Sequence, residues 1–469
     1  MRERLRGVLL AMLVAFAPAC QTDDGVSLRR APSGSRPSTG ARIIGFVGTL
    51  SGPDSWRGED AFEGADLAVH DLNRRRGPGT VPFELRPLDD EGDAGAATQL
   101  VEQLADLSAT VGVVYAGPPE GLPPAEGALA GAGVPAVLCF GELLGGAPPH
   151  QFATSLPFAA QARALVGYLG RDRGYRRIGV LVESSPSGAA ALDELRRAVT
   201  APLDLVAARG EPGRSTQEAL RRLRRRRVEA VVVTGDPGAL SDVVRVLRRW
   251  GSTYRTTAAA RTISRPGSAL PRPPGRTWRP QLAGFDLAIS PGAGPVVAGA
   301  VAPDLYTRGS HYLPLGPLRR FRNAFEAWWG SPPTGWQARA YDAARAIGWA
   351  ARGAEPGSDL AERLEELSGR RFAGLPVSFG PRDHHAYGTR SLGLWVVPGP
   401  GAGTPEQARA EAFRTFPWVP LARSFTSGRA ITGVLPADRP HLFRRRPADA
   451  APFARMRFGV TTPRSDPIH

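Results

Sequence analysis

The feature that most constrains the fold of this chain is the alternation of short apolar runs with amphipathic helical patterns between residues 42 and 250. Apolar runs such as "IIGFV" (43–47) have no polar face, so each strand must be covered on both sides. The segments between them, such as 60–73, repeat apolar residues every three or four positions, which is typical of amphipathic helices. Buried strands joined by helices form parallel sheets, and right-handed crossovers then give doubly wound α/β layers.

The alternation runs twice, which predicts two α/β lobes of similar size joined by "QFATSLP" (151–157). The 469 residues, 42% of them hydrophobic, are sufficient for two such cores. Ligands of parallel α/β sheets bind beyond the carboxyl ends of the strands. The loop "TLSGPDSWRGED" (49–60) follows the first strand directly, so we expect it to lie at a cleft between the lobes.

Residues 1–20 predict export from the cytoplasm. A basic start, an apolar stretch and small residues form a secretory signal peptide, which is too short for a comfortable membrane span. The segment ends in "APAC", which resembles a bacterial lipoprotein signal and predicts a lipid anchor at Cys20; ordinary cleavage near Ala19 is the alternative. Residues 21–41 are rich in Ser, Gly, Pro and Arg, which is typical of a flexible linker. We therefore expect a cell-envelope protein held to a membrane through Cys20.

The net charge of +15 comes from arginine alone, because the 59 basic residues include no lysine. One interpretation is a surface for nucleic acid or an anionic membrane, and the other is general use of arginine, as in proteins of GC-rich genomes. The arginines are spread along the chain without a nucleic-acid-binding motif, so we expect no nucleic-acid partner. The densest run, "RRLRRRR" (221–227), is expected to form the solvent face of a helix that leads into a buried strand.

No pattern in the sequence indicates catalysis. Metal-ligand spacing, a nucleophile elbow and a dinucleotide fingerprint are all missing, so we expect neither an enzyme nor a cofactor. Two cysteines cannot form a metal site alone, and Cys139 is expected to be a buried small hydrophobe. His384 and His385 are adjacent, so on a strand they would point to opposite faces; we expect them to be exposed turn residues that share no metal ion.

Several motifs occur in a fixed order along the chain. The first strand is followed by "LSGP" (50–53), by Gly58 and by the helical "GADLAVHDLN" (64–73). Further motifs follow in order: "LRPLDDEGDAGAATQLVEQL" (85–104), "GVPAVLCF" (133–140), "YRRIGVLVESSPSG" (175–188), "AYDAARAIGWAA" (340–351) and "FAGLPVSFGPRDHHAYGTRSLGLWVV" (372–397). Over residues 42–398 this set resembles the type I periplasmic binding proteins, in particular the branched-chain amino-acid (leucine/isoleucine/valine) receptors of ABC transporters.

The resemblance implies two doubly wound lobes joined by three hinge crossovers. The N-terminal lobe would comprise 42–153 and 284–370, and the second lobe 154–283 and 371–398. Ligand binding would close the lobes about the hinge. The Pro- and Arg-rich tail, 399–469, lies beyond the resemblance, and its structure is not predicted.

The ligand pocket departs from the pattern of the amino-acid receptors. In that group, hydroxyls and backbone N–H groups of the first lobe hold the ligand carboxylate, while an acidic residue and a Tyr of the second lobe help to hold the amino group. Here "GPPEG" (117–121) and "FGEL" (140–143) replace the two segments that hold the carboxylate, which removes hydroxyls and adds carboxylates. The expected Tyr is replaced by Ser187, whereas the acidic residue is expected to be retained as Asp286. The residues that we expect to line the pocket are Trp56, Arg57, Glu120, Glu142, Ser187, Asp236 and Asp286.

The acidic members of this set favour a small-molecule ligand of cationic or hydroxylated character, with Trp56 as a packing wall or cation–π face. The alternative is that they are solvated loop carboxylates on a lobe that no longer binds amino acids. The expected function is a solute-binding protein that closes on a small polar ligand, an amino acid or related amine, and delivers it to an ABC permease. The alternative function is an envelope receptor of the same fold, or a regulator of a cell-wall enzyme, which binds a protein and does not transport.

Overall fold

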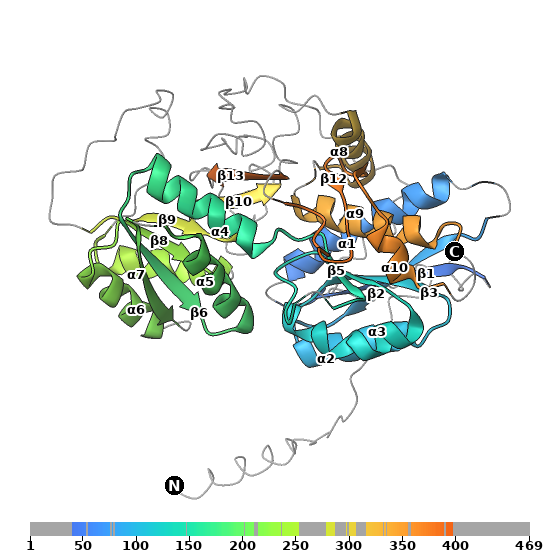
Figure 1. Ribbon diagram of the computed structural model, residues 1–469, viewed down its shortest axis with the longest axis horizontal. Coiled ribbons are helices and arrows are strands. Elements are labelled where there is room, and N and C mark those ends of the chain that lie inside the picture. The colour runs from blue at the N-terminus through green and yellow to red at the C-terminus, as the bar shows by residue number, and fades with distance from the viewer. Residues whose placement is uncertain are drawn as a thin grey trace, which may run out of the picture.

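The computed structural model describes residues 40–252, 278–305 and 316–396, with gaps at 53–54, 76, 78–79, 147, 201, 211–213, 236, 287–296, 298–299, 332, 334, 355–357 and 389–390. Two α/β lobes lie side by side (Figure 1). Each is built around a sheet with five parallel strands, and the second sheet has one additional antiparallel strand. The predicted fold class is therefore confirmed.

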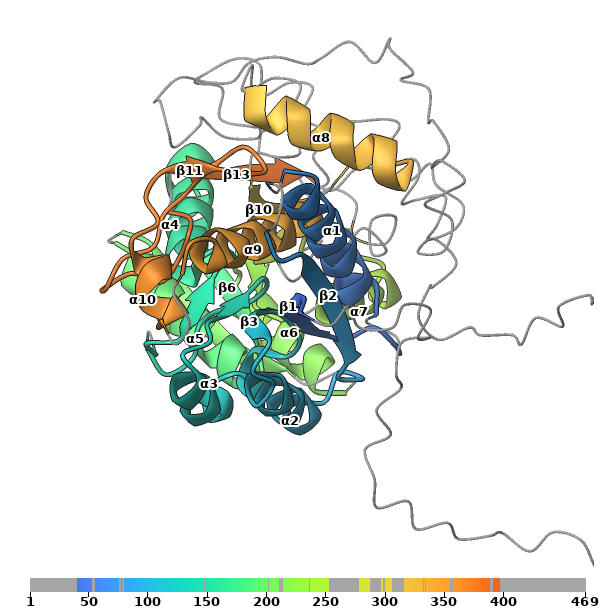
Figure 2. The ribbon, with the colours of Figure 1, turned by 90° about the vertical axis from the view of Figure 1, so that its right-hand side faces the viewer.

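The first sheet has the order β2-β1-β3-β4-β5, with every neighbouring pair parallel. Its strands are β1 (Arg42–Gly48), β2 (Phe83–Asp89), β3 (Thr110–Ala116), β4 (Ala136–Leu138) and β5 (Gln151–Ala153). One face is covered by α1 (Ser55–Arg74) and α9 (Gly335–Ala351), and the other by α2 (Ala94–Ala105) and α3 (Glu126–Ala132), as Figure 2 shows.

The second sheet has the order β13-β10-β9-β8-β6-β7, in which only β13 is antiparallel to its neighbour. Its strands are β6 (Arg177–Glu183), β7 (Asp204–Gly210), β8 (Ala230–Val233), β9 (Gln281–Gly284), β10 (Val301–Leu305) and β13 (Leu392–Val396). The helices α4 (Phe158–Val166) and α5 (Pro186–Ala198) pack together on one face, and α6 (Arg214–Arg225) and α7 (Pro237–Arg249) on the other (Figure 1).

Smaller elements complete the lobes. The helix α8 (Gly316–Trp329) lies along α1, where the Trp328 indole N–H donates to an Asp66 carboxylate oxygen at 2.9 Å. The other elements are η1 (Pro119–Gly121), η2 (Pro123–Ala125), the π-helical η3 (Gly167–Asp172), α10 (Leu360–Glu365), and the paired strands β11 (Arg370–Arg371) and β12 (Pro376–Val377).

Two glycines of the opening motif are required by close backbone approaches. A Cβ atom at Gly58 would lie 2.0 Å from the carbonyl oxygen of Thr49, and one at Gly64 would lie 2.1 Å from that of Gln337. Any larger residue would therefore push α1 away from the β1 loop or from α9. The close approach of Gly58 to Thr49 explains why the start of α1 lies close to the carboxyl end of β1.

The expected solvent face of the arginine-rich helix is confirmed. The arginines of the 221–227 run are exposed, whereas Leu220 and Leu223 of α6 are fully buried. A helix with such one-sided burial packs its leucines on the sheet and leaves its cations in water. The expected burial of Cys139 is also confirmed.

Two of the lobe boundaries expected from the sequence come too early. The strand β10, expected in the first lobe, pairs with β9 and β13 in the second sheet. Residues 371–388, expected in the second lobe, contact the first: the Ala153 N–H donates to the His384 carbonyl at 2.8 Å, and the Ala373 N–H donates to Asp342 of α9 at 2.6 Å. Short apolar strands look alike in sequence, so their pattern does not tell which of two sheets they join.

The expected lipid anchor at Cys20, the signal peptide, the linker and the 399–469 tail lie outside the described residues. Asp236 lies outside them as well. Within the described part of the chain, no helix combines the length and apolar character that crossing a membrane requires.

Candidate functional site

The expected binding residues of the first lobe lie at the carboxyl ends of its strands. Trp56 and Arg57 begin α1, directly after β1 and its loop. Glu120 lies in η1 after β3, and Glu142 follows β4. Since β1, β3 and β4 are parallel neighbours, the four side chains start from the same end of the sheet.

The two lobes meet through a hydrogen bond between expected site residues. Ser187, near the start of α5, donates from its hydroxyl to a Glu120 carboxylate oxygen at 3.0 Å. Ser187 is 9% exposed, so its side of this contact is largely shielded from solvent. The interaction is charge-assisted and links the carboxyl end of β3 in one lobe to that of β6 in the other.

Trp56 forms one wall of an aromatic group in the first lobe. Its ring packs edge-on against Trp336 of α9, with centroids 5.5 Å apart and an interplanar angle of 86°. Trp336 is 2% exposed and also contacts Phe140 at 4.5 Å. The sequence does not indicate Trp336 as a site residue, because its helical pattern is that of a core position.

Arg57 lies beside Trp56, and two of its guanidinium nitrogens have no hydrogen-bond partner among the described residues. Its guanidinium carbon is 5.3 Å from the centre of the Trp56 ring. The Nε and Nη2 atoms are buried and have no hydrogen-bond partner among the described residues. A buried donor without an acceptor costs roughly 1–3 kcal/mol, more when charged. Arg57 is therefore suited to bind an acceptor such as a ligand carboxylate.

Asp286 was expected to offer its carboxylate to a ligand, but both of its carboxylate oxygens have protein partners. Its Oδ2 pairs with Nη1 of Arg339 at 2.6 Å, and the two side chains are 2% and 0% exposed. Gln161 of α4 donates to Oδ1 at 2.8 Å and accepts from the Asp286 backbone N–H at 2.8 Å. Because Arg339 belongs to α9 and Asp286 follows β9, this buried ion pair links the lobes and leaves Asp286 with several partners.

Glu142 is also satisfied within the protein. Its carboxylate accepts the Phe158 backbone N–H at 2.5 Å, and it forms an ion pair with Nε2 of His385 at 2.7 Å. Although burial alone would lower the pKa of His385, its interactions with Asp383 and Glu142 together raise the pKa to about 9. The imidazolium and Glu142 therefore neutralise each other at neutral pH. A pocket of about 420 Å³ lies beside them, between this loop and α5.

The expectation that the adjacent histidines are exposed turn residues is wrong. His384 is 2% exposed and stacks on Phe152 with ring centroids 4.3 Å apart. Its Nδ1 lies 2.8 Å from the Gln151 carbonyl oxygen, so Nδ1 carries the proton. The segment extends the edge of the first sheet through a bridge between His385 and Ala153, and that pairing is invisible in the local sequence.

The two expected clamp segments pack against each other. The carbonyl of Pro118 accepts the Tyr115 hydroxyl at 2.6 Å and the Gly121 N–H at 2.9 Å, so these donors are used inside the protein. Gly141 has a φ of 81°, and a Cβ there would lie 2.5 Å from Cγ of Pro119. This corner of the site therefore offers a ligand fewer hydroxyl and N–H donors than the amino-acid receptors are expected to have.

A buried carboxyl group lies beneath the first loop. Asp90 accepts the Thr49 hydroxyl at 2.8 Å and the Gly92 N–H at 2.8 Å. Burial raises the pKa of Asp90 to about 6, against these hydrogen bonds, which lower it. No group of three or more His, Cys, Asp or Glu side chains suitable for a metal ion occurs within the described residues.

The facing lobes and the residues at their strand ends define a two-lobed binding-protein fold. The family model described as periplasmic binding protein matches residues 43–396. The chain therefore belongs to the periplasmic binding protein family, as the sequence motifs indicate. No curated protein matches the chain.

Solved structures share the fold at low sequence identity. A type 1 periplasmic binding protein from Bordetella pertussis aligns with a TM-score of 0.62 and 19% identity, covering 76% of this chain and 96% of the other. The branched-chain amino acid transporter substrate-binding protein of Streptococcus pneumoniae, solved with isoleucine, gives 0.63 and 17%, covering 76% and 96%. A leucine-binding protein from Thermotoga maritima gives 0.63 and 14%, covering 76% and 95%. At these identities the similarity shows the fold alone.

Proposed function

We propose that the chain is an extracytoplasmic solute-binding protein that closes its lobes on a small polar ligand and delivers it to an ABC permease. The observation that carries the proposal is the pair Arg57 and Glu120 at the carboxyl ends of neighbouring strands, with Ser187 of the other lobe already in contact with Glu120. A cation with unused donors and a carboxylate at the same end of the sheet suit a ligand of mixed charge. Membership of a solute-binding family supports this function and an extracytoplasmic location.

We assign separate roles to the rim residues. Arg57 would hold the ligand carboxylate, Glu120 the ammonium group, and Trp56 the apolar part of the ligand. Ser187 would exchange its bond to Glu120 for one to the ligand. Asp236, which lies outside the described residues, stays a predicted contact. Glu142 and Asp286 would shape the site rather than bind directly, since each has protein partners.

A thermal-shift screen of the chain from residue 21, against amino acids, polyamines, sugars and short peptides, tests this proposal. A ligand that binds only the folded state at about 100 times its Kd stabilises that state by about 2.7 kcal/mol, which raises Tm by several degrees. Arg57→Gln should abolish the shift caused by an amino acid. Arg86→Gln removes an arginine from β2, where it pairs with Glu84, and should leave the shift unchanged.

We also propose that the chain is anchored to a membrane by a lipid on Cys20. The "APAC" sequence and the following linker support this. Expression of the full chain with radioactive palmitate should label the wild type but not Cys20→Ser. A wild-type protein released in soluble form without label would refute the anchor.

The second candidate function is an envelope receptor or regulator that binds a protein. Two observations favour this function over the binding of an amino acid. Pro119 packs on Gly141, and Asp286 is buried in an ion pair with Arg339. If no compound in the panel changes Tm, and a genetic neighbourhood lacks a permease and an ATPase, this second function replaces the first.

A further inference from the structure

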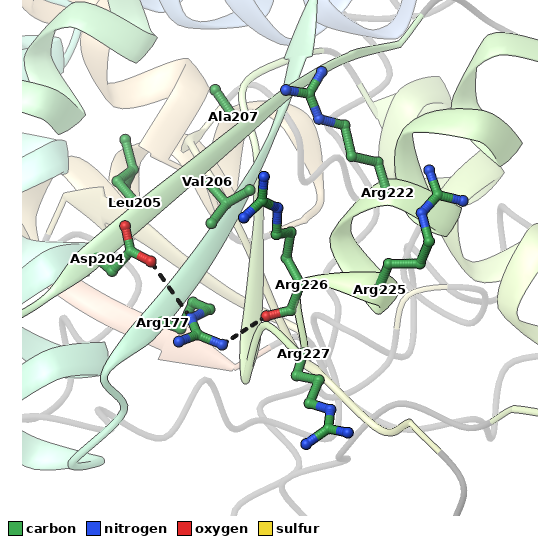
Figure 3. Close-up of a pocket in the computed structure, with 9 residues that line it drawn as sticks. All are labelled: Arg177, Asp204, Leu205, Val206, Ala207, Arg222, Arg225, Arg226 and Arg227. Atoms are coloured by element: carbon green, nitrogen blue, oxygen red, sulfur yellow. Dashed lines mark hydrogen bonds and ion pairs between the residues drawn. The ribbon is translucent and has the colours of Figure 1, made fainter.

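A basic groove runs along the outer edge of the second sheet, away from the cleft. It has a volume of about 540 Å³ and is lined by residues 204–207 of β7 and by five arginines (Figure 3). The arginines are Arg177 of β6, Arg222 and Arg225 of α6, and Arg226 and Arg227 after α6. These residues lie at the amino ends of β6 and β7 and just before β8, whereas the proposed ligand site lies at the carboxyl ends of the strands.

The positive charge of this groove is largely unmatched. Arg177 pairs with Asp204 at 3.4 Å and donates to the Arg226 carbonyl at 2.9 Å. The other four arginines are exposed, and within the described part of the chain no carboxylate forms an ion pair with them. Two exposed arginines on other helices of the lobe do have partners: Arg196 pairs with Asp193 at 3.0 Å and Arg245 with Asp242 at 2.7 Å. The groove therefore favours an acidic partner.

The groove also follows an unpaired strand edge. Among the described residues β7 pairs only with β6, so its outer backbone groups have no ladder partner there. Leu205 and Ala207 point to one face of the sheet and Val206 to the other. The groove touches all three, so it follows β7, the outermost strand of the sheet, over these residues. Such an edge is a template for an added strand, with main-chain hydrogen bonds giving affinity and side chains giving specificity.

We propose that this groove binds an extended acidic segment of a partner protein, which adds to the sheet as a strand beside β7 while its carboxylates pair with the arginines. Four of the nine lining residues belong to β7, and three of these are the half-buried apolar residues Leu205, Val206 and Ala207. Such a strand suits a peptide and offers little to a phosphodiester chain. The chain's own residues 397–469 carry more arginine than Asp and Glu together, so the complementary charge comes from another protein.

The test uses the full chain from residue 21 and a fluorescein-labelled peptide of about seven residues, the length of β7, in which Glu and Val alternate. Two further peptides carry N-methyl groups at odd or at even positions, which removes alternate N–H donors. In fluorescence anisotropy the parent peptide should bind. Only one N-methylated peptide should lose affinity, by about tenfold or more, because only one edge of the added strand faces β7. Equal binding of all three peptides would overturn strand addition.

Variants locate the binding site. Arg222→Ser combined with Arg225→Ser should weaken the parent peptide about tenfold, from the loss of two charge pairs. The control, Arg196→Ser with Arg245→Ser, removes the same charge from exposed helix positions of the same lobe and should have no effect. Circular dichroism checks that both variants fold. Failure of the peptide to bind refutes the proposal, as does stronger arginine-dependent binding of polyphosphate, single-stranded DNA or phosphatidylglycerol vesicles. Neither result bears on the solute cleft.

Discussion

The buried Asp90 makes the stability of the first lobe depend on pH. Its side chain is 0% exposed, and its Oδ1 accepts from both Thr49 and Gly92. Its Oδ2 has no hydrogen-bond partner among the described residues and lies where a Cβ on Gly117 would be 2.1 Å away. The perturbation is Asp90→Asn, which keeps the Oδ1 acceptor and removes the ionisation.

The magnitude follows from the raised pKa of Asp90. Burial raises it from the usual 3.8 to about 6, so the folded state holds the proton more tightly than the unfolded state. The stability gained from this is fully present below the unfolded value and is lost as pH rises through about 6. One unit of pKa corresponds to about 1.36 kcal/mol. Relative to the protein with Asp90 fully protonated, ionisation therefore lowers the free energy of unfolding by about 1 kcal/mol at about pH 4.5 and by about 3 kcal/mol at about pH 7.5.

Urea unfolding followed by tryptophan fluorescence measures the difference. The Asn amide adds an unpaired N–H group, which shifts the free energy of unfolding by a constant amount at all pH values. The stability of Asp90→Asn relative to wild type should therefore improve by about 2 kcal/mol between about pH 4.5 and 7.5. Asp106→Asn, at the exposed C-cap of α2, is the control. A difference for Asp90→Asn that stays constant across this range would refute the reasoning.

Three further outcomes are expected. Arg339→Leu should destabilise the protein by about 3–5 kcal/mol, because it leaves the Asp286 charge buried, and the double variant with Asp286→Leu should recover much of this in a double-mutant cycle. His385→Gln should flatten the dependence of stability on pH in the alkaline range. The raised pKa of about 9 for His385 adds stability that is fully present below about pH 6.5 and is lost as pH rises through 9. An unchanged dependence on pH would count against the ion pair. Gly64→Ala should lower Tm markedly in a thermal melt, whereas Gly127→Ala, in a helix with open space at the Cβ, should not.

Much of the fold could be predicted because it depends on local patterns. The strand "IIGFV" is buried on both faces, and Gly58 stands where the α1 start meets the β1 loop. These signals lie within a few residues of each other in sequence. The assignment of β10 to a sheet depends on contacts between distant segments, and its apolar sequence fits either sheet equally well. Topology was therefore predictable at the level of elements but not at the lobe crossovers.

The candidate site was less predictable, for a related physical reason. A carboxylate's position after a strand can be read from the sequence, but its partners cannot. Asp286 is neutralised by Arg339, which lies 53 residues further along the chain on a helix whose other positions read as core. An arginine among the core positions of a helix indicates a buried ion pair, since a buried guanidinium needs a carboxylate. The sequence alone did not say which carboxylate.

The two links between the lobes constrain which ligand can enter. The Asp286–Arg339 pair is buried on both sides and can persist when a ligand binds. The contact between Ser187 and Glu120 is only 3.0 Å long, so a ligand held by both must separate them. Breaking a hydrogen bond to a charged group costs about 1.5–3 kcal/mol unless the ligand replaces it. In the proposed site, an ammonium group would replace the Ser187 donor with a stronger one, and a carboxylate would satisfy Arg57 at the same time. A zwitterion should therefore bind more tightly than a polyamine, which leaves Arg57 without an acceptor, and a neutral sugar should bind most weakly.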